Sequence, residues 1–124
     1  MIKSLLLVSL GASFGASFRF ICYHLLPSSL LATFFVNSLG SFLLGVLTFW
    51  ANSKSPSHWS TAIHLILGVG FLGSFTTFST LSREMFLLLE THWLKAISIG
   101  MGQVAAGLGL FLIGWKLTHF FMRT

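Results

Sequence analysis

The sequence predicts an all-α integral membrane protein, because its residues are too apolar to cover a surface that faces water. Of the 124 residues, 55% are hydrophobic and only 7% are charged, and the mean hydropathy is +0.91. Soluble domains carry about 25% charged residues. The apolar residues gather in four stretches, each long enough to cross a bilayer, which takes about 20 residues. We therefore expect a single membrane domain of four transmembrane helices over residues 1–124.

The four expected spans cover residues 4–26, 30–51, 62–89 and 94–121. Pro27 marks a tight turn after the first span, Asn52–Ser60 is the one hydrophilic loop, and Thr91 and His92 separate the last two spans. The third and fourth spans are longer than a bilayer needs, which predicts a tilt or a break.

The charges set the topology and exclude one class of partner. The net charge is +5, but the basic residues form no run or stripe, so we expect no nucleic acid partner. Four of them (Lys3, Lys54, Lys116 and Arg123) lie on the side of the termini and Lys95 lies on the other. The positive-inside rule then places the termini in the cytoplasm of a multi-pass protein of the cell inner membrane. So weak a bias also permits insertion in both orientations and hence an antiparallel dimer.

No catalytic set is visible. The chain has no aspartate, its only carboxylate side chains are Glu84 and Glu90, and no metalloprotease or phosphate-binding motif occurs. Because an intramembrane hydrolase needs a nucleophile with a base or a metal, we expect no enzyme.

A polar stripe follows the second span. Thr33, Asn37, Ser41 and Gly45 recur every four residues, with Thr48 next, so they share one helical face. Either the hydroxyls bond within the protein as structure, or the stripe faces a pathway. Asn37 favours the pathway, because its carboxamide cannot satisfy all its donors and acceptors alone in lipid.

The third span predicts a break near Gly73–Phe78. Gly68, Gly70 and Gly73 precede Thr76–Thr80. Each glycine costs a helix about 1 kcal/mol relative to alanine, and serine and threonine side chains compete for backbone hydrogen bonds. A break would expose carbonyl oxygens that hold a cation and amide hydrogens that attract an anion. The alternative is a softened but continuous helix.

Two embedded charges leave their roles open. Arg19 either reaches out to the membrane surface or supplies positive charge to an anion vestibule. Glu84 either pairs with Arg83 or faces water and carries a proton. Pairs of small residues let helices approach closely, within one subunit or between subunits, and these pairs are Gly11/Gly15, Gly102/Ala106 and Ala105/Gly109.

Four stretches taken together resemble the CrcB/Fluc family of small fluoride channels: Gly11–Arg19, Thr33–Phe42, Gly45 and Gly68–Glu84. The resemblance implies an antiparallel, dual-topology homodimer with two fluoride pores along the subunit interface and a third helix broken at mid-membrane. It also implies a structural sodium ion at the dimer centre, held by backbone carbonyls at Gly73 and Thr76.

The resemblance also implies pore residues. Asn37 matches the pore asparagine, Phe78 matches the first pore phenylalanine, and Ser79 and Thr80 match the polar track that follows. The remaining candidates for the anion pore are Arg19, Ser41, Leu81, Glu84 and Gln103, the last at the matching polar position of the fourth span.

Leu81 departs from the family pattern, which has a second phenylalanine there. The edge of an aromatic ring is electropositive and can meet an anion, whereas leucine offers only bulk. The departure indicates either a modified pore or a subunit that works with a partner chain.

We therefore expect a fluoride-selective channel that exports cytoplasmic fluoride passively. The alternatives are a small proton-coupled multidrug transporter, or a partner subunit of a heteromeric fluoride channel that forms a heterodimer with a paralogue. The transporter needs an embedded carboxylate in its first span, and this chain has none there.

Overall fold

A computed structural model describes residues 1–53 and 58–123 of the chain, and every regular element within them is a helix. The elements are α1 (Ile2–Leu25), α2 (Ser29–Ser53), α3 (His58–Ile63), the π-helix η1 (His64–Leu72), α4 (Gly73–Phe75) and α5 (Phe78–Arg123). α5 consists of two helical segments joined at His92, whose φ of −146° and ψ of 71° are not helical.

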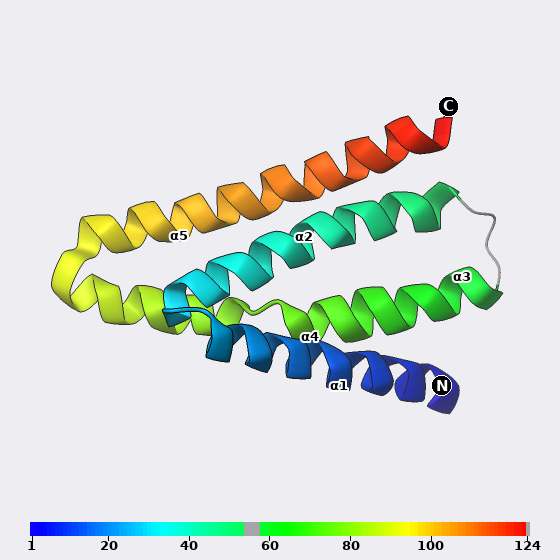
Figure 1. Ribbon diagram of the computed structural model, residues 1–124, viewed down its shortest axis with the longest axis horizontal. Coiled ribbons are helices and arrows are strands. Elements are labelled where there is room, and N and C mark those ends of the chain that lie inside the picture. The colour runs from blue at the N-terminus through cyan, green and yellow to red at the C-terminus, as the bar shows by residue number, and fades with distance from the viewer. Residues whose placement is uncertain (54–57, 124) are drawn as a thin grey trace.

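The helices run back and forth along one axis, with both termini at the same end (Figure 1). α1 packs beside η1 and α4, and α2 packs beside α5. At His92 the chain turns back on itself, at the yellow end of the ribbon in Figure 1. The hydrophilic loop expected at Asn52–Ser60 is shorter at both ends, because α2 runs to Ser53 and α3 begins at His58, while residues 54–57 lie outside the described residues.

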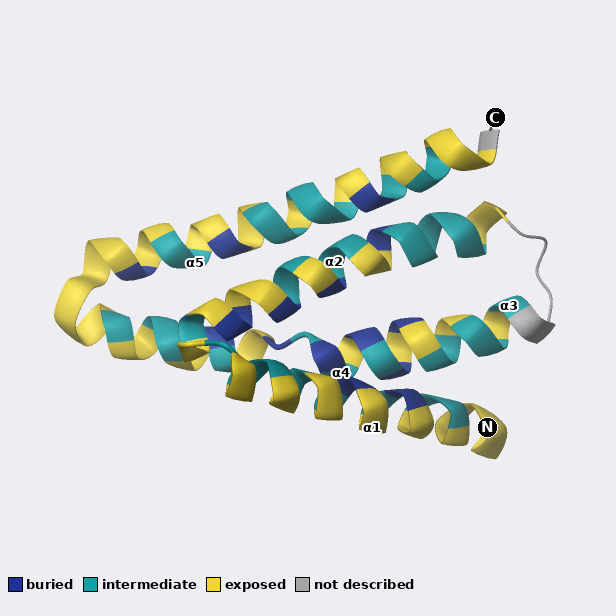
Figure 2. Ribbon diagram, viewed as in Figure 1, coloured by how far each residue is buried: buried dark blue, intermediate teal, exposed yellow. Residues whose placement is uncertain are grey.

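The outer surface is far more apolar than that of a soluble protein. Large apolar side chains cover the outside, whereas polar Thr33, Thr77 and Gln103 are buried (Figure 2). Such an outer surface is stable in hydrocarbon, where backbone groups must be satisfied by helices. The helical stretches long and apolar enough to cross a membrane are Ile2–Leu25, Ser29–Ser53 and Ser60–Met122. The chain thus has the architecture of a helical integral membrane protein.

Glycines set how closely the helices approach. A Cβ atom at Gly11 or Gly15 of α1 would collide with backbone of η1, and one at Gly114 of α5 would collide with the Phe42 carbonyl of α2. The Gly11/Gly15 pair is therefore used within the subunit. By contrast, a Cβ atom at Gly102 or Gly109 would meet nothing within 4 Å, so that part of α5 leaves open space.

Candidate functional site

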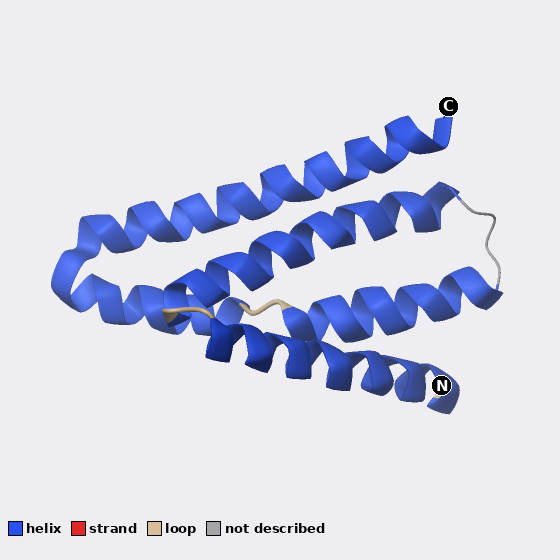
Figure 3. Cartoon of the chain, in the orientation of Figure 1, coloured by secondary structure: helices blue, strands red, loops and turns tan. Residues whose placement is uncertain are grey.

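Helical structure stops at Phe75 and resumes at Phe78, within the segment where the glycines and hydroxyls predict a break. Thr76 is extended, with a φ of −78° and a ψ of 158°, and Thr77 is also non-helical. This connection is the short tan loop beside α4 in Figure 3.

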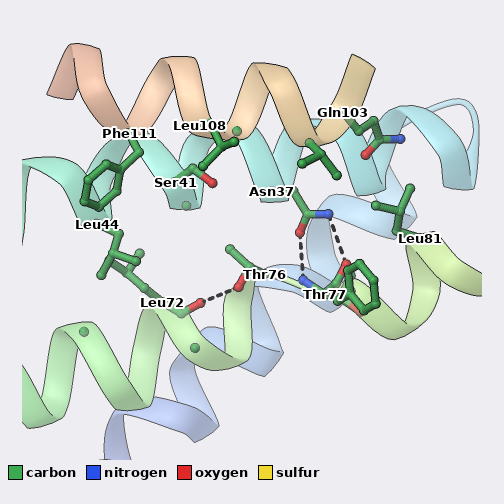
Figure 4. A pocket seen from close by; sticks show the side chains of 16 residues that line it. Asn37, Ser41, Leu44, Leu72, Thr76, Thr77, Leu81, Gln103, Leu108 and Phe111 are labelled. Carbon is green, nitrogen blue, oxygen red and sulfur yellow. Dashed lines mark hydrogen bonds between the residues drawn. The ribbon is translucent and has the colours of Figure 1, made fainter. Parts of the chain in front are cut away.

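Asn37 of α2 holds this connection in place. The Thr77 amide donates to Asn37 Oδ1 over 2.8 Å, and Asn37 Nδ2 donates back to the Thr77 carbonyl over 3.0 Å (Figure 4). Thr77 is only 6% exposed, so its peptide groups have little access to solvent. A buried peptide group left without a partner costs about 1–3 kcal/mol, and the Asn37 carboxamide removes that cost on both sides of Thr77.

The same arrangement releases two backbone carbonyls. In a continuous α-helix the Thr77 amide would donate to the Gly73 carbonyl, and the Thr80 amide to the Thr76 carbonyl. Here the Thr77 amide bonds to Asn37, and the Thr80 amide donates to Thr77 Oγ1 over 3.2 Å, a helix cap for α5. The carbonyls of Gly73 and Thr76 thus lose their helical donors at the positions where the family resemblance implies a cation.

Arg19 of α1 reaches the same connection. Its Nη1 donates to the Thr76 carbonyl over 3.3 Å, so the guanidinium turns into the protein and not out to the membrane surface. Arg19 also lines a cavity of about 460 Å³ together with Tyr23 of α1 and the hydroxyl residues Thr77, Ser79 and Thr80.

The aliphatic hydroxyls of Thr77, Ser79 and Thr80 form one cluster in this cavity. Thr77 Oγ1 lies 3.3 Å from Ser79 Oγ and 3.0 Å from Thr80 Oγ1. The structure thus brings Ser79 and Thr80 together with Arg19 at one cavity. Sequence reasoning missed Tyr23, although it lies one helical turn after Arg19 and therefore shares its face.

A second cavity, a groove of about 400 Å³, lies on the other side of Thr77, which borders both. It is formed by α2, η1, α4 and α5, and Figure 4 shows the side chains that line it. The predicted site residues that it brings together are Asn37, Ser41, Gly73, Thr76, Phe78, Leu81 and Gln103, and the apolar remainder includes Leu44, Leu72, Val104, Leu108 and Phe111.

The two positions at which the family pattern has phenylalanines differ sharply in exposure. Phe78, at the start of α5, is 76% exposed, whereas Leu81, one turn later, is 6% exposed. Phe75 is 3% exposed and stacks on Phe71 with ring centroids 5.8 Å apart. Phe75 is therefore a packing residue and does not stand in for the aromatic ring that Leu81 lacks.

Glu84 is turned toward α2. Its Oε1 accepts hydrogen bonds from the Ser29 hydroxyl and, over 3.0 Å, from the Thr33 hydroxyl. Thr33 in turn pairs with the Tyr23 hydroxyl at 2.5 Å. Among the described residues Glu84 makes no ion pair with Arg83, and it lines neither of the two cavities. Its other oxygen, Oε2, is buried without a hydrogen-bond partner.

The residues of the polar stripe on the second span therefore make different kinds of contact. Thr33 contacts Glu84, Asn37 contacts Thr77, and Ser41 lines the groove. Gly45 packs against the Phe111 backbone and Thr48 donates back to the Leu44 carbonyl of its own helix. Only the middle of the stripe, at Asn37 and Ser41, faces the groove.

Sequence comparison assigns the chain to a family. Residues 6–115 match the family described as "CrcB-like protein, Camphor Resistance (CrcB)". This chain belongs to the CrcB family. It is 38% identical to the fluoride-specific ion channel FluC of Oceanobacillus iheyensis, over 93% of this chain and 91% of that protein. It is 46% identical to proteins of the same name from Shewanella baltica and another Shewanella strain, over 76% of this chain and 78% of each of them.

Proposed function

We propose that this CrcB-family chain forms a fluoride-selective channel through which fluoride leaves the cytoplasm passively. The observation that supports this most directly is the extended Thr76–Thr77 connection, which separates a hydroxyl-lined cavity holding Arg19 from a groove holding Phe78. A small, strongly hydrated anion needs donors that replace its water, and such donors gather on both sides of Thr77.

Each group in the proposed path has its own task. Arg19 attracts the anion into the cavity, and the hydroxyls of Ser79 and Thr80 turn their hydrogens toward it. The electropositive edge of the Phe78 ring meets the partly dehydrated ion. Asn37 supports the path by fixing the peptide of Thr77, because both ends of its carboxamide are engaged there.

We further propose that the working unit is an antiparallel, dual-topology homodimer. In this assembly each chain crosses the membrane four times. The third pass runs through α3, η1, α4 and the part of α5 before His92, with the Thr76–Thr77 connection at mid-membrane, and the rest of α5 forms the fourth pass. Phe78 is largely exposed on the single subunit, and α5 offers open space at Gly102 and Gly109. A second copy against these surfaces would enclose the groove.

A sodium ion fits the centre of this assembly. The carbonyls of Gly73 and Thr76 both lack their helical donors, and Gly73 lies exposed on the subunit surface. The Thr76 carbonyl also accepts from Arg19, which leaves its second lone pair for a cation. Carbonyl oxygens are ligands that a hard cation prefers. Two copies of each carbonyl, one from either subunit, would hold sodium as a structural ion and lock the two connections together.

Passive export needs no chemical step. In acid surroundings fluoride enters a cell as neutral hydrofluoric acid, dissociates inside and is trapped. A negative interior then drives the anion outward, by about 2.3 kcal/mol per elementary charge for each 100 mV. An open, selective path in the inner membrane is therefore sufficient.

Efflux from liposomes tests the proposal. Purified protein is reconstituted with potassium fluoride inside, valinomycin carries the potassium, and a fluoride electrode follows the anion. We expect rapid fluoride efflux and, in matched vesicles, chloride efflux no faster than from protein-free liposomes. Fluoride efflux equal to that of protein-free liposomes, or equally fast chloride efflux, would contradict a fluoride-selective homomeric channel.

Leu81 favours one second candidate, a partner subunit in a heteromeric channel. Leu81 is packed at 6% exposure where the family resemblance implies an aromatic ring, so a paralogue with that ring would complete the path. Absence of flux from this chain alone, with flux on co-reconstitution of a paralogue from the same cell, would identify this role.

A further inference from the structure

A chain of hydrogen bonds runs from Glu84 to the wall of the cavity that holds Arg19. The Thr33 hydroxyl donates to Glu84 Oε1 over 3.0 Å and lies 2.5 Å from the Tyr23 hydroxyl. Tyr23 in turn lines the cavity beside Arg19. The chain thus connects a carboxylate that lies outside both cavities to a side chain in the wall of one of them.

The number of available hydrogens fixes the direction of each bond in this chain. A threonine hydroxyl has one hydrogen, and a carboxylate can only accept. Thr33 is buried without exposed surface, so solvent supplies it with no further partner. Because the Thr33 hydrogen goes to Glu84, the Thr33 oxygen accepts and Tyr23 is the donor. The phenolic hydrogen of Tyr23 is therefore directed to α2 and withheld from the cavity.

The cavity has other donors that an anion can use. The Arg19 guanidinium and the hydroxyls of Ser79 and Thr80 line it. A pore must bind an ion strongly enough to admit it and weakly enough to release it. One more hydrogen bond to a charged group contributes about 1.5–3 kcal/mol, which is about tenfold or more in binding. A Tyr23 hydrogen that turned to the anion would therefore slow its release.

We propose that Thr33 and Glu84 hold the Tyr23 hydrogen away from the cavity, and that this restraint keeps the anion bound loosely enough to pass on. Thr33 is then a positioning residue that acts through Tyr23, because it sets how tightly the cavity binds the anion without lining the cavity itself. This inference rests on the proposed channel function.

The saturation of fluoride efflux tests the inference. Liposomes are loaded with a series of potassium fluoride concentrations, potassium glutamate keeps the ionic strength constant, and valinomycin carries the potassium. Thr33→Ala removes the acceptor of the Tyr23 hydrogen and leaves the phenol in place. We expect the fluoride concentration that gives half-maximal efflux to fall about tenfold, and the maximal rate to fall because the anion leaves the cavity more slowly. A variant that is merely misfolded lowers the maximal rate alone.

Three further variants serve this measurement. Thr33→Ser keeps the hydroxyl and should saturate as the wild type does. Thr48→Ala removes a threonine hydroxyl of the same helix that bonds only to the Leu44 carbonyl, and it should also match the wild type. Should Thr33→Ala fail to assemble on size-exclusion chromatography, Thr33→Val removes the same hydroxyl while filling its space, and we expect the same fall in the half-maximal concentration.

A double variant isolates the Tyr23 hydrogen. In a Tyr23→Phe background there is no phenolic hydrogen to release, so Thr33→Ala should change the half-maximal concentration less than about twofold relative to Tyr23→Phe alone. A half-maximal concentration that Thr33→Ala leaves unchanged in the wild-type background, or an equal shift in both backgrounds, overturns the inference.

The wild-type protein distinguishes the two levels of failure. If it shows no fluoride efflux above protein-free liposomes, the homomeric channel function itself fails. If it conducts and Thr33→Ala saturates at the same fluoride concentration, the channel function stands and only the role of the Thr33 hydroxyl fails.

Discussion

Asn37 of α2 and Thr77, 40 positions later in the chain, exchange two hydrogen bonds across the connection between α4 and α5. One carboxamide thus satisfies both peptide groups of a buried, non-helical residue. Thr77 borders both cavities, so the pairing ties the wall that they share to α2. Asn37 therefore holds the interruption between α4 and α5 in a defined place beside α2.

Removal of the Asn37 carboxamide should destabilise the fold. Asn37→Ala leaves the amide and the carbonyl of Thr77 without partners, which predicts a loss of about 2–4 kcal/mol in the free energy of unfolding, since each group costs about 1–3 kcal/mol. Denaturant titration in detergent, followed by circular dichroism, measures it. Thr48→Val is the control, because Thr48 bonds only within its own helix; equal stability of the two variants would show that the pairing contributes nothing.

Phe78→Ile should reduce transport without disturbing the subunit fold. The ring is 76% exposed on the subunit, so its loss opens no cavity in the core, but it removes the electropositive edge proposed to meet the anion. We expect fluoride efflux to fall at least about tenfold, the equivalent of about 1.4 kcal/mol. Phe86→Ile, at another exposed position of α5 outside the groove, should retain normal efflux. Unchanged efflux from Phe78→Ile would remove Phe78 from the path.

Arg19 variants should separate charge from hydrogen bonding. Arg19→Lys keeps the positive charge, whereas Arg19→Gln keeps N–H donors on a shorter side chain and removes the charge. If the charge attracts the anion, Lys should conserve most of the fluoride efflux and Gln should lower it, most clearly at low ionic strength, where screening is weak. The reverse order would indicate that Arg19 acts by holding the Thr76 backbone.

Two glycine variants should report on two different surfaces. A Cβ atom at Gly15 would collide with the Phe71 backbone, so Gly15→Ala should destabilise the subunit by about 1–3 kcal/mol. A Cβ atom at Gly109 meets nothing within 4 Å of its own subunit, so Gly109→Ala should leave subunit unfolding unchanged. If a second copy packs there, Gly109→Ala should instead shift the monomer–dimer equilibrium measured in detergent or lipid, and an unchanged equilibrium would place the interface elsewhere.

Local sequence pattern was enough to predict the helical membrane architecture and the place of the interruption. A single apolar stretch of bilayer length can satisfy its own backbone hydrogen bonds in hydrocarbon only as a helix. Three glycines followed by threonines at 76 and 77 lower the stability of one helical turn, and the helix stops at Phe75. Both conclusions depend on residues only a few positions apart.

Only the tertiary structure decided which polar group meets which. Asn37, which was expected to face a pathway, lines the groove and also binds the Thr77 peptide. Among the described residues Glu84 bonds to Ser29 and Thr33 and not to its neighbour Arg83. Their partners lie 40 to 55 positions away, so only the packing of the folded chain brings them together. The sequence alone determined that polar side chains must be satisfied inside an apolar protein. Helix packing determined which of them satisfy one another and which, like the oxygen of the Gln103 carboxamide, lie buried without a partner.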